Sequence, residues 1–310
     1  MLVTRTDALG DLVVTLPIVR ALKEAHPAVQ VDLLVRGYAV PLAIQAIGVD
    51  RVVEWTADMA ARPGGAGATA LRKGEYDVSI HAFPDAAVLK AAHQAGIPMR
   101  IATGRRWSGL RHANHRVWDS RRESGGHEAW HGLRLLLPLH IDPDLGYRTA
   151  CGLEAPEADP DLRAQLDSMD RPLALLHPGS HGSAGNWPPA QFAELSARLA
   201  DAGCIVGLTG TAMEQEAFSR FRPVREDVID FGGHFDLTQL MAIQASAALV
   251  VASSTGPLHT AAALGTPCVG LYGPAAPEWA ERWAPLGPSV RVCTAETQTP
   301  DGALDLSVED

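Results

Sequence analysis

The sequence has 310 residues, of which 46% are hydrophobic and 20% are charged, a composition typical of a globular protein with apolar cores. This length suits about two domains of roughly 150 residues, and no apolar run reaches the ~18 residues that a membrane-spanning helix needs. The formal net charge of −10 argues against a protein that binds nucleic acid non-specifically through a global basic field.

Cysteine usage and the first residues bear on the compartment. The four cysteines have no CxxC spacing: Cys151, Cys204, Cys268 and Cys293. Neither a zinc site nor a disulfide framework is expected from them. The start, MLVTRTDALGD, carries charges early and precedes no long apolar stretch, so we expect no signal peptide. Together these features predict a cytoplasmic protein.

The first half of the chain alternates short apolar runs with helical patterns. Strands are predicted at residues 1–5, 29–36, 49–55 and 76–83. Helices are predicted where apolar positions recur with helical spacing, at residues 12–25, 41–47 and 85–95. This alternation predicts a parallel sheet with right-handed crossovers.

A stretch rich in proline and aspartate, residues 153–172, separates this half from a second alternation. Strands are predicted there at residues 172–179, 204–210, 228–233, 248–253 and 268–273. Helices are predicted at residues 188–201, 211–221, 237–246 and 257–264. We therefore predict an α/β protein of two doubly wound domains, residues 1–155 and 170–310, which bind ligands at strand carboxyl ends in a cleft between them. The last ~20 residues are a candidate for packing back on the first domain.

The first candidate site is TRTDALGDLVVTLP, residues 4–17. Gly10 permits a tight turn between the strand and the helix. Asp11 falls at the helix start, where a carboxylate can cap the helix and is stabilised by the helix dipole. The functional alternative is that Asp11 acts as a general base at the carboxyl end of the strand. No GxGxxG motif is present, so a dinucleotide site is not favoured.

The second candidate site is LLHPGSHGSAGNWPPAQF, residues 175–192, a Gly- and Ser-rich loop between a strand and a helix. Backbone N–H groups of such a loop, and the helix N-terminus beyond it, can bind phosphate. Ser180, Ser183 and Asn186 add neutral hydrogen-bonding groups. A plain connector is the alternative, but so many small residues at a strand end favour a phosphate site.

The third candidate site is LTGTAMEQE, residues 208–216, where a strand ends before a helix. Glu214 falls in the first turn of that helix. Its carboxylate either interacts favourably with the helix dipole or accepts hydrogen bonds from a ribose diol, and the sequence supports both roles equally.

The fourth candidate site is SSTGPLHTAAALGTPCVGLYGP, residues 253–274. Thr255 and Gly256 offer a hydroxyl and backbone N–H groups at a helix start, and Pro257 suits the first helical positions. The turn is explained either by capping or by a bound phosphate. His259, one turn inside the helix, is more typical of a packed histidine than of a catalyst.

A basic stretch, RRWSGLRHANHRVWDSRR at residues 105–122, contrasts with the acidic chain. It has six arginines and two tryptophans around one acid, Asp119. It is either a solvated loop whose arginines lie along apolar surface, or a site where arginines bind an anionic partner bidentately. No HExxH, DxD-type pair or GxSxG motif occurs, so neither a bound metal nor covalent catalysis is expected.

Taken in order, these stretches resemble glycosyltransferase family 9, the ADP-heptose:lipopolysaccharide heptosyltransferases. The likeness is carried by RTDALGDLVVTLPIVRALKEAHP, YDVSI, HPGS…NWPPAQFAEL, LTGTAMEQE, STGPLHTAAALGTPCVGLYGP and RWAPLG. It implies the GT-B fold, with two Rossmann-like domains facing across a cleft, the first for the acceptor and the second for the nucleotide sugar. It also implies an inverting, metal-independent transfer of heptose from ADP-heptose to a lipopolysaccharide inner-core acceptor.

The resemblance also implies roles for residues. Asp11 is the general base that takes a proton from the acceptor hydroxyl. Glu214 matches the ribose-binding glutamate, and Phe235 by its spacing lies near the adenine. The rest of the donor is assigned to Ser180, His181, Ser183, Asn186, Ser254, Thr255, Gly256, Pro257 and His259. The acceptor is assigned to Asp7, Arg105, Arg106 and Arg111.

The implied partners are a nucleotide-sugar donor and an anionic glycolipid acceptor. Peripheral contact with the cytoplasmic face of the inner membrane fits such an acceptor, whereas nucleic acid, a metal or another cofactor is not expected.

Two positions depart from the family's pattern. Gly185 stands where a lysine is usual, and Ser254 stands where an aspartate is usual. The loss of one cation and one anion together leaves the local net charge unchanged. The two departures leave open which nucleotide sugar is the donor. The alternatives are a relative that uses another nucleotide sugar or a non-lipopolysaccharide acceptor, and a non-catalytic nucleotide-sugar-binding protein.

Overall fold

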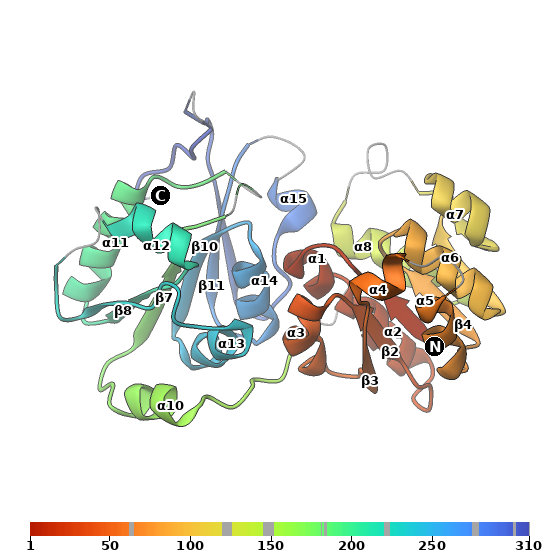
Figure 1. The fold of residues 1–310 in the computed structure, drawn as a ribbon. Helices are drawn as coiled ribbons and strands as arrows, with labels where there is room; N and C mark the ends of the chain where they lie inside the picture. Colours follow the sequence, from red (N-terminus) through yellow and green to blue (C-terminus); the bar gives the residue numbers. More distant parts are fainter. Residues whose placement is uncertain are drawn as a thin grey trace. The chain divides into compact units, whose positions relative to one another are not determined.

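The chain forms two compact units, Met1–Cys151 and Gly152–Asp310, here called unit 1 and unit 2 (Figure 1). The computed structural model describes residues 1–61, 65–119, 126–144, 152–180, 182, 185–219, 224–274, 279–299 and 302–309. Each unit contains one six-stranded sheet, and all paired strands run parallel. No helix in the described ranges is long and apolar enough to cross a membrane.

The sheet of unit 1 has the order β3-β2-β1-β4-β5-β6. Its strands are β1 (Leu2–Thr4), β2 (Asp32–Val35), β3 (Arg51–Glu54), β4 (Val78–His81), β5 (Met99–Thr103) and β6 (His115–Val117). The four strands predicted from the sequence are β1 to β4, whereas β5 and β6 were not predicted. From β1 the chain adds β2 and β3 on one side of the sheet and then β4, β5 and β6 on the other side. The boundary between β1 and β4 is therefore the switch point where doubly wound sheets bind ligands.

Helices flank this sheet (Figure 1). They are α1 (Leu9–Val13), α2 (Leu16–Ala25), α3 (Val40–Ile44), α4 (Ala57–Ala61), α5 (Ala66–Lys73), α6 (Ala86–Ala95), α7 (Trp107–His112) and α8 (Glu128–Leu133), with 3₁₀ turns η1 (Gly37–Ala39) and η2 (Arg134–Leu139). The single helix predicted at residues 12–25 is wrong, because α1 ends before α2 begins. Pro17 lies in the first turn of α2, where its missing N–H is harmless, whereas inside one continuous helix it would remove a hydrogen bond.

The sheet of unit 2 has the order β12-β11-β10-β7-β8-β9, which repeats the topology of unit 1. Its strands are β7 (Leu173–His177), β8 (Ile205–Leu208), β9 (Val228–Asp230), β10 (Leu249–Ser253), β11 (Cys268–Tyr272) and β12 (Val290–Thr294). All five strands predicted for this half are present, and β12 extends the sheet. The switch point lies between β7 and β10.

Two apolar clusters cover the two faces of the unit 2 sheet. The helices are α10 (Pro160–Asp167), α11 (Pro189–Asp201), α12 (Ala212–Ser219), α13 (Leu237–Ser246), α14 (Gly256–Ala263) and α15 (Ala280–Trp283). Leu175 of β7 packs in the cluster with α10, α13 and α14, and its neighbour Leu176 packs in the other cluster with α11. Consecutive residues of a strand face opposite sides, so β7 is buried on both.

Candidate functional site

In unit 1 the candidate catalytic carboxylate lies just beyond β1, at the switch point. Arg5 follows the strand directly, and its side chain is only 5% exposed. Its Nε lies 2.6 Å from Oδ1 of Asp7, while its Nη2 donates to Oδ2 of Asp7 at 3.0 Å and also to Oδ1 of Asp11. One buried guanidinium therefore orients both carboxylates.

Asp11 does not cap its helix. Ala8 is the N-cap residue of α1, and no side chain makes a capping hydrogen bond there. Asp11 lies in the first turn, where the helix dipole favours an anion, but its carboxylate accepts from Arg5. The capping interpretation is wrong, and the dipole and the general-base role are compatible with this geometry.

The surroundings of Asp11 strengthen it as a proton acceptor. Burial raises the pKa of Asp11 above its ordinary value of 3.8; the charge of Arg5 opposes this rise, and the charges of Asp7 and Glu128 add to it. Burial alone would lower the pKa of Arg5, but Asp11 and Asp7 raise it overall, so the cation persists. Because the Asp11 side chain remains 22% exposed, an oriented carboxylate of raised proton affinity is open to a substrate.

Arg5 and Glu128 were missed from the sequence. Arg5 stands within the first motif, and an arginine directly after a buried strand is a signal for a buried ion pair with the neighbouring acids. Glu128 is 3% exposed at the start of α8, far from Asp11 in the sequence. Only the fold brings it close enough to affect Asp11.

The residues predicted to bind the acceptor lie in two different places in unit 1. Asp7 lies beside Asp11 through their shared arginine. The other three are exposed in the β5–α7 turn and in α7: Arg105, Arg106 and Arg111. They lie on the same carboxyl edge of the sheet, where Ser108 of α7 donates to the carbonyl of Pro84 at 2.9 Å. The end of the basic stretch, residues 120–122, lies outside the described ranges.

Asp119, the one acid of that stretch, is paired inside unit 1. It is hydrogen bonded to Nδ1 of His131, and Nε of Arg134 lies 3.7 Å from its Oδ1. Asp119 and His131 line a cavity of about 30 Å³ together with His81, whose pKa is lowered to about 3 by burial and by the charge of Arg100. This cavity has room for water but not for a sugar ring.

In unit 2 the turn between β10 and α14 carries two buried hydroxyls. Thr255 is the N-cap residue of α14, yet its side chain makes no capping hydrogen bond. Thr255 and Ser253 are 6% and 0% exposed, and neither hydroxyl has a hydrogen-bond partner among the residues that the structure describes. Capping is therefore the wrong explanation of this turn. Buried polar groups normally have partners, so the two hydroxyls favour a ligand at a helix N-terminus, where an anion binds well.

The N-terminal turn of α14 is held rigidly from behind. Gln244 of α13 is 1% exposed; its Nε2 donates to the carbonyl of Pro257 at 2.8 Å, and its Oε1 accepts from Thr260 at 2.8 Å. Pro257 lies in the first two helical positions, as predicted. His259 is 3% exposed, which fits the packed histidine expected from the sequence.

Ser254 is engaged with the core of unit 2. Its side chain shares a hydrogen bond with the phenol of Tyr272, which is 1% exposed. The Tyr272 hydroxyl donates in turn to the carbonyl of Trp283 at 2.6 Å. Burial raises the pKa of Tyr272, and the hydrogen bond with Ser254 opposes part of that rise. A neutral side chain at position 254 therefore suits a buried, uncharged neighbour.

The loop after β7 is partly described. Ser180 is 5% exposed, and its Oγ accepts from the N–H of Gly182 at 3.2 Å. Asn186 is exposed, and its carbonyl accepts from the N–H of Leu304 at 2.9 Å. The predicted donor residues His181 and Ser183 lie outside the described ranges.

Gly185, the other position that departs from the family's pattern, lies against the C-terminal segment. A Cβ at this position would lie 2.9 Å from Cδ2 of Leu304 and 3.0 Å from Nε2 of Gln298. Leu304 is 1% exposed and pairs with Gln298 in an isolated bridge. A side chain at position 185 would require the ends of the Leu304 and Gln298 side chains to shift.

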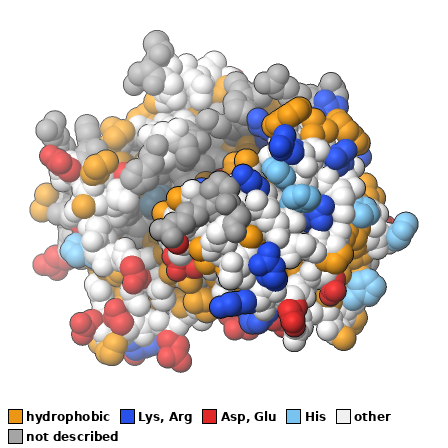
Figure 2. All heavy atoms as spheres, turned by 45° about the vertical axis from the view of Figure 1, so that its right-hand side comes forward, with side chains coloured by type: hydrophobic (Ala, Val, Ile, Leu, Met, Phe, Trp, Pro, Cys, Tyr) orange, Lys and Arg blue, Asp and Glu red, His pale blue; other side chains and the backbone are white. Residues whose placement is uncertain are grey.

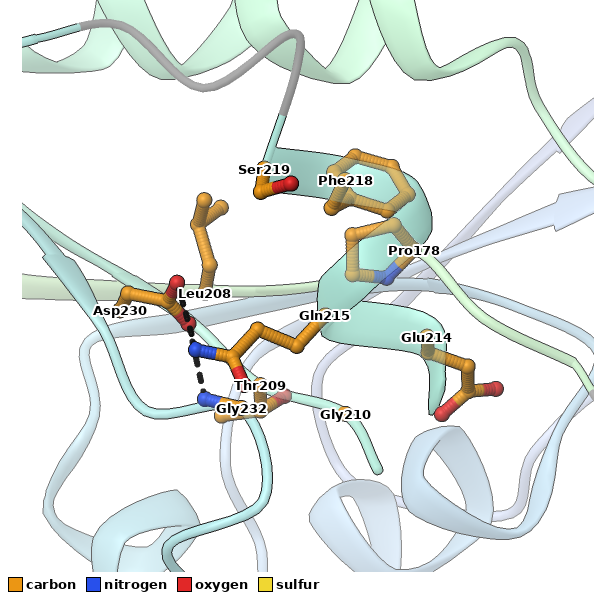
Figure 3. A pocket seen from close by; sticks show the side chains of 10 residues that line it. All are labelled: Pro178, Leu208, Thr209, Gly210, Glu214, Gln215, Phe218, Ser219, Asp230 and Gly232. Atoms are coloured by element: carbon orange, nitrogen blue, oxygen red, sulfur yellow. Dashed lines mark hydrogen bonds between the residues drawn. The ribbon is translucent and has the colours of Figure 1, made fainter. Parts of the chain in front are cut away.

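The third motif forms a pocket at the carboxyl ends of β8 and β9 (Figure 3). It is lined by Pro178, Leu208, Thr209, Gly210, Glu214, Gln215, Phe218, Ser219, Asp230 and Gly232. Oε2 of Glu214 accepts from the N–H and the hydroxyl of Thr211 at 2.8 and 2.9 Å, which caps α12. Asp230 accepts from Gln215 at 3.1 Å and from the N–H of Gly232 at 2.9 Å. The volume is about 10 Å³, so a ligand larger than water would lie across its mouth.

Phe235, which the resemblance placed near an adenine, stacks on Phe231. Their ring centroids are 5.1 Å apart with an interplanar angle of 29°. Phe235 is partly buried against the apolar cluster that contains Phe231. Its nearness to an adenine stays a prediction.

The second, third and fourth motifs meet at one edge of the unit 2 sheet. β10, β7 and β8 are neighbours, and the segments that follow them carry Thr255, Ser180 and, in the first turn of α12, Glu214. β7 and β10 flank the switch point, so the candidate phosphate-binding elements lie where this topology provides a ligand crevice.

Comparison with known proteins gives consistent matches. The sequence model of glycosyltransferase family 9 (heptosyltransferase) matches residues 66–303. Lipopolysaccharide heptosyltransferase 2 of Escherichia coli is 28% identical over a gapped alignment of 327 positions, which covers 94% of this chain and 87% of that protein. Lipopolysaccharide heptosyltransferase 1 of Salmonella typhimurium is 25% identical over 293 residues, covering 89% of each. The structure of E. coli ADP-heptose lps heptosyltransferase II has a TM-score of 0.79 at 23% identity, covering 99% of this chain and 95% of that one.

Proposed function

The chain belongs to glycosyltransferase family 9 and has the GT-B fold, and from this premise we propose that it is an inverting heptosyltransferase that uses ADP-heptose. As a member of this family it is a glycosyltransferase. The names of its relatives in E. coli and S. typhimurium support a lipopolysaccharide acceptor, and we assign the inner core of that glycolipid as its substrate.

Unit 2 is the proposed donor domain. The diphosphate would bind at the N-terminus of α14 and accept hydrogen bonds from Ser253 and Thr255, the hydroxyls that lack partners in the described protein. The neighbouring loop with Ser180 would supply further groups, and the ribose would lie across the pocket mouth at Glu214. Such fixed neutral donors stabilise the charge that develops on a leaving diphosphate.

Unit 1 is the proposed acceptor domain, with Asp11 as the general base. The acceptor oxygen attacks the anomeric carbon, and its proton passes to the Asp11 carboxylate. The bond from the anomeric carbon to the diphosphate oxygen breaks, its electron pair leaves with ADP, and the configuration inverts. Arg5 would hold the carboxylate in position through this step. Asp7 and the arginines of the β5–α7 turn would meet anionic groups of the acceptor.

The observation that carries this proposal is the state of Asp11: buried enough to raise its pKa, oriented by Arg5, and still partly exposed. The proposal includes metal-independent transfer, in which helix ends and hydroxyls meet the phosphate charge. Neither an added metal nor another cofactor is assigned a step.

Asp11→Asn tests this assignment, because the amide keeps the shape of the side chain but cannot take the proton. We expect turnover from ADP-heptose to a core acceptor to fall by about 10²–10⁴-fold. ADP should still stabilise the variant against heat, since binding of the nucleotide is assigned to unit 2. Asp50→Asn is the control, because this acid pairs with Lys23 and has no assigned role in transfer. Unchanged turnover in Asp11→Asn would contradict the assignment.

A further inference from the structure

Tyr38 is a half-exposed aromatic residue that lies beside the candidate catalytic carboxylate. It belongs to η1, shortly after β2, and is 51% exposed. On the face of the protein shown in Figure 2, hydrophobic side chains reach the surface among charged and polar ones. Exposure of one aromatic side chain is therefore ordinary, and what distinguishes Tyr38 is its position.

The hydroxyl of Tyr38 fixes the ring to the turn that carries Asp7. It donates to the carbonyl of Asp7, whose carboxylate shares the Arg5 guanidinium with Asp11. Burial and then the charge of Asp7 raise the pKa of Tyr38 above its ordinary value of 10.0, and the charge of Asp11 adds to the rise. The phenol therefore stays neutral and keeps the proton that it donates, and it lies close enough to Asp11 to be affected by its charge.

The backbone that carries Tyr38 is held by two neighbouring loops. Nε of Arg36 donates to the carbonyl of Thr6 at 2.9 Å, and Nη2 of Arg36 lies 3.6 Å from Oδ2 of Asp85. The N–H of Ala39 donates to the carbonyl of Arg36 at 2.9 Å. The loop after β2 is thereby joined to the loops after β1 and β4, which flank the switch point. A ring that is fixed by its hydroxyl and by its backbone loses little conformational freedom when a ligand covers it.

A fixed, exposed aromatic face beside a carboxylate suits a saccharide. A sugar ring has a face of C–H groups with partial positive charge, which matches the negative face of an aromatic ring. Ligand sites commonly combine aromatic walls with a few polar groups, and the sugar hydroxyls would meet the polar groups here. A free anion would gain little from Tyr38, because its one hydroxyl proton is already donated to the carbonyl of Asp7.

We propose that Tyr38 is an acceptor-binding residue, and that the saccharide ring which presents its hydroxyl to Asp11 lies against the exposed face of the phenol. The inference rests on the proposed function, in which unit 1 takes the acceptor and Asp11 takes its proton. The aromatic face favours a sugar with an uninterrupted face of C–H groups, and the phenol hydroxyl holds the turn that carries Asp7. Tyr38 itself transfers no proton.

Binding of the acceptor without a donor tests this assignment. The full chain is titrated calorimetrically with a lipid-free inner-core oligosaccharide that lacks heptose, so no transfer occurs. Tyr38→Leu keeps an apolar side chain but removes the aromatic face, and it should weaken oligosaccharide binding by about 10-fold or more. Tyr38→Phe keeps the face and removes only the hydroxyl, and its affinity should stay within about 3-fold of the wild type.

Urea unfolding separates binding from a structural role. Both variants lose the hydrogen bond to Asp7, so both should unfold at lower urea than the wild type, whereas only Tyr38→Leu should lose affinity. Ile47→Ala is the control, because it changes a side chain that is 49% exposed after α3 and has no assigned role. It should bind the oligosaccharide as the wild type does. Stabilisation by ADP should persist in every variant, which shows that each is folded.

Unchanged affinity in Tyr38→Leu would overturn the proposal. Equal losses in Tyr38→Leu and Tyr38→Phe would also overturn it, because the hydroxyl and not the ring would then be responsible. Absence of binding to the wild type would overturn it together with the acceptor assignment. If the variants behave as expected but the chain transfers no heptose from ADP-heptose, only the proposed function fails, so the two proposals are distinguishable.

Discussion

Thr255→Val tests whether the Thr255 hydroxyl binds a ligand or stabilises the fold. If it binds a ligand, the substitution should weaken ADP binding without lowering the free energy of unfolding. Valine keeps the shape of threonine and removes only the hydroxyl, which has no partner in the described protein. The unliganded protein should therefore lose no hydrogen bond, and its free energy of unfolding should be unchanged or rise by about 1 kcal/mol. A lost hydrogen bond to a charged phosphate is about 1.5–3 kcal/mol, so ADP should bind about 10- to 100-fold more weakly.

The assay is urea unfolding without ligand, followed by calorimetric titration with ADP. Thr260→Val, on the same helix, is the matched control, because the Thr260 hydroxyl donates to buried Gln244 at 2.8 Å. That variant should lose about 1–2 kcal/mol of stability while its affinity for ADP stays near that of the wild type. Loss of stability in Thr255→Val with unchanged ADP affinity would refute the reasoning and restore a capping role.

Three further predictions follow from the same geometry. Glu128→Gln removes a charge that raises the pKa of Asp11, and a base works only when deprotonated, so the acid limb of the kcat/KM profile should move to lower pH; a move upward would contradict this. Gly185→Lys, which installs the lysine that the family resemblance leads us to expect at this position, should lower the free energy of unfolding by about 1–3 kcal/mol through contact with Leu304, without raising turnover; a more active, equally stable variant in urea unfolding and transfer assays would count against it. Heptose transfer should continue at an unchanged rate after EDTA treatment, and loss of activity restored by Mg²⁺ would argue for a metal.

The buried strands could be predicted because parallel strands covered on both faces form continuous apolar runs. β7, LALLH, is buried at every position and was predicted. The missed strands are partly exposed: β5 is fully buried only at Ile101 and Ala102, β6 contains exposed His115 and Arg116 and forms one edge of its sheet, and β12 forms an edge of the other. Partly exposed strands lack the continuous apolar pattern on which the prediction depends.

The candidate site was predictable where its chemistry is local. The motifs around Asp11 and Thr255 combine a strand end, a small residue and a helix start within a few positions. The contribution of Glu128 to Asp11 and the packing of Leu304 against Gly185 join distant segments, and no local pattern encodes them. Whether the Thr255 hydroxyl caps its helix or awaits a ligand likewise depends on side-chain geometry.

The most direct test of the central claim is transfer with defined substrates. The purified chain is incubated with ADP-heptose and a lipopolysaccharide inner-core acceptor that lacks heptose, and the product is examined by mass spectrometry and by NMR of the new linkage. The account predicts one added heptose per acceptor, released ADP and an inverted anomeric configuration. Transfer from a UDP- or GDP-sugar but not from ADP-heptose, or retention of configuration, would contradict it.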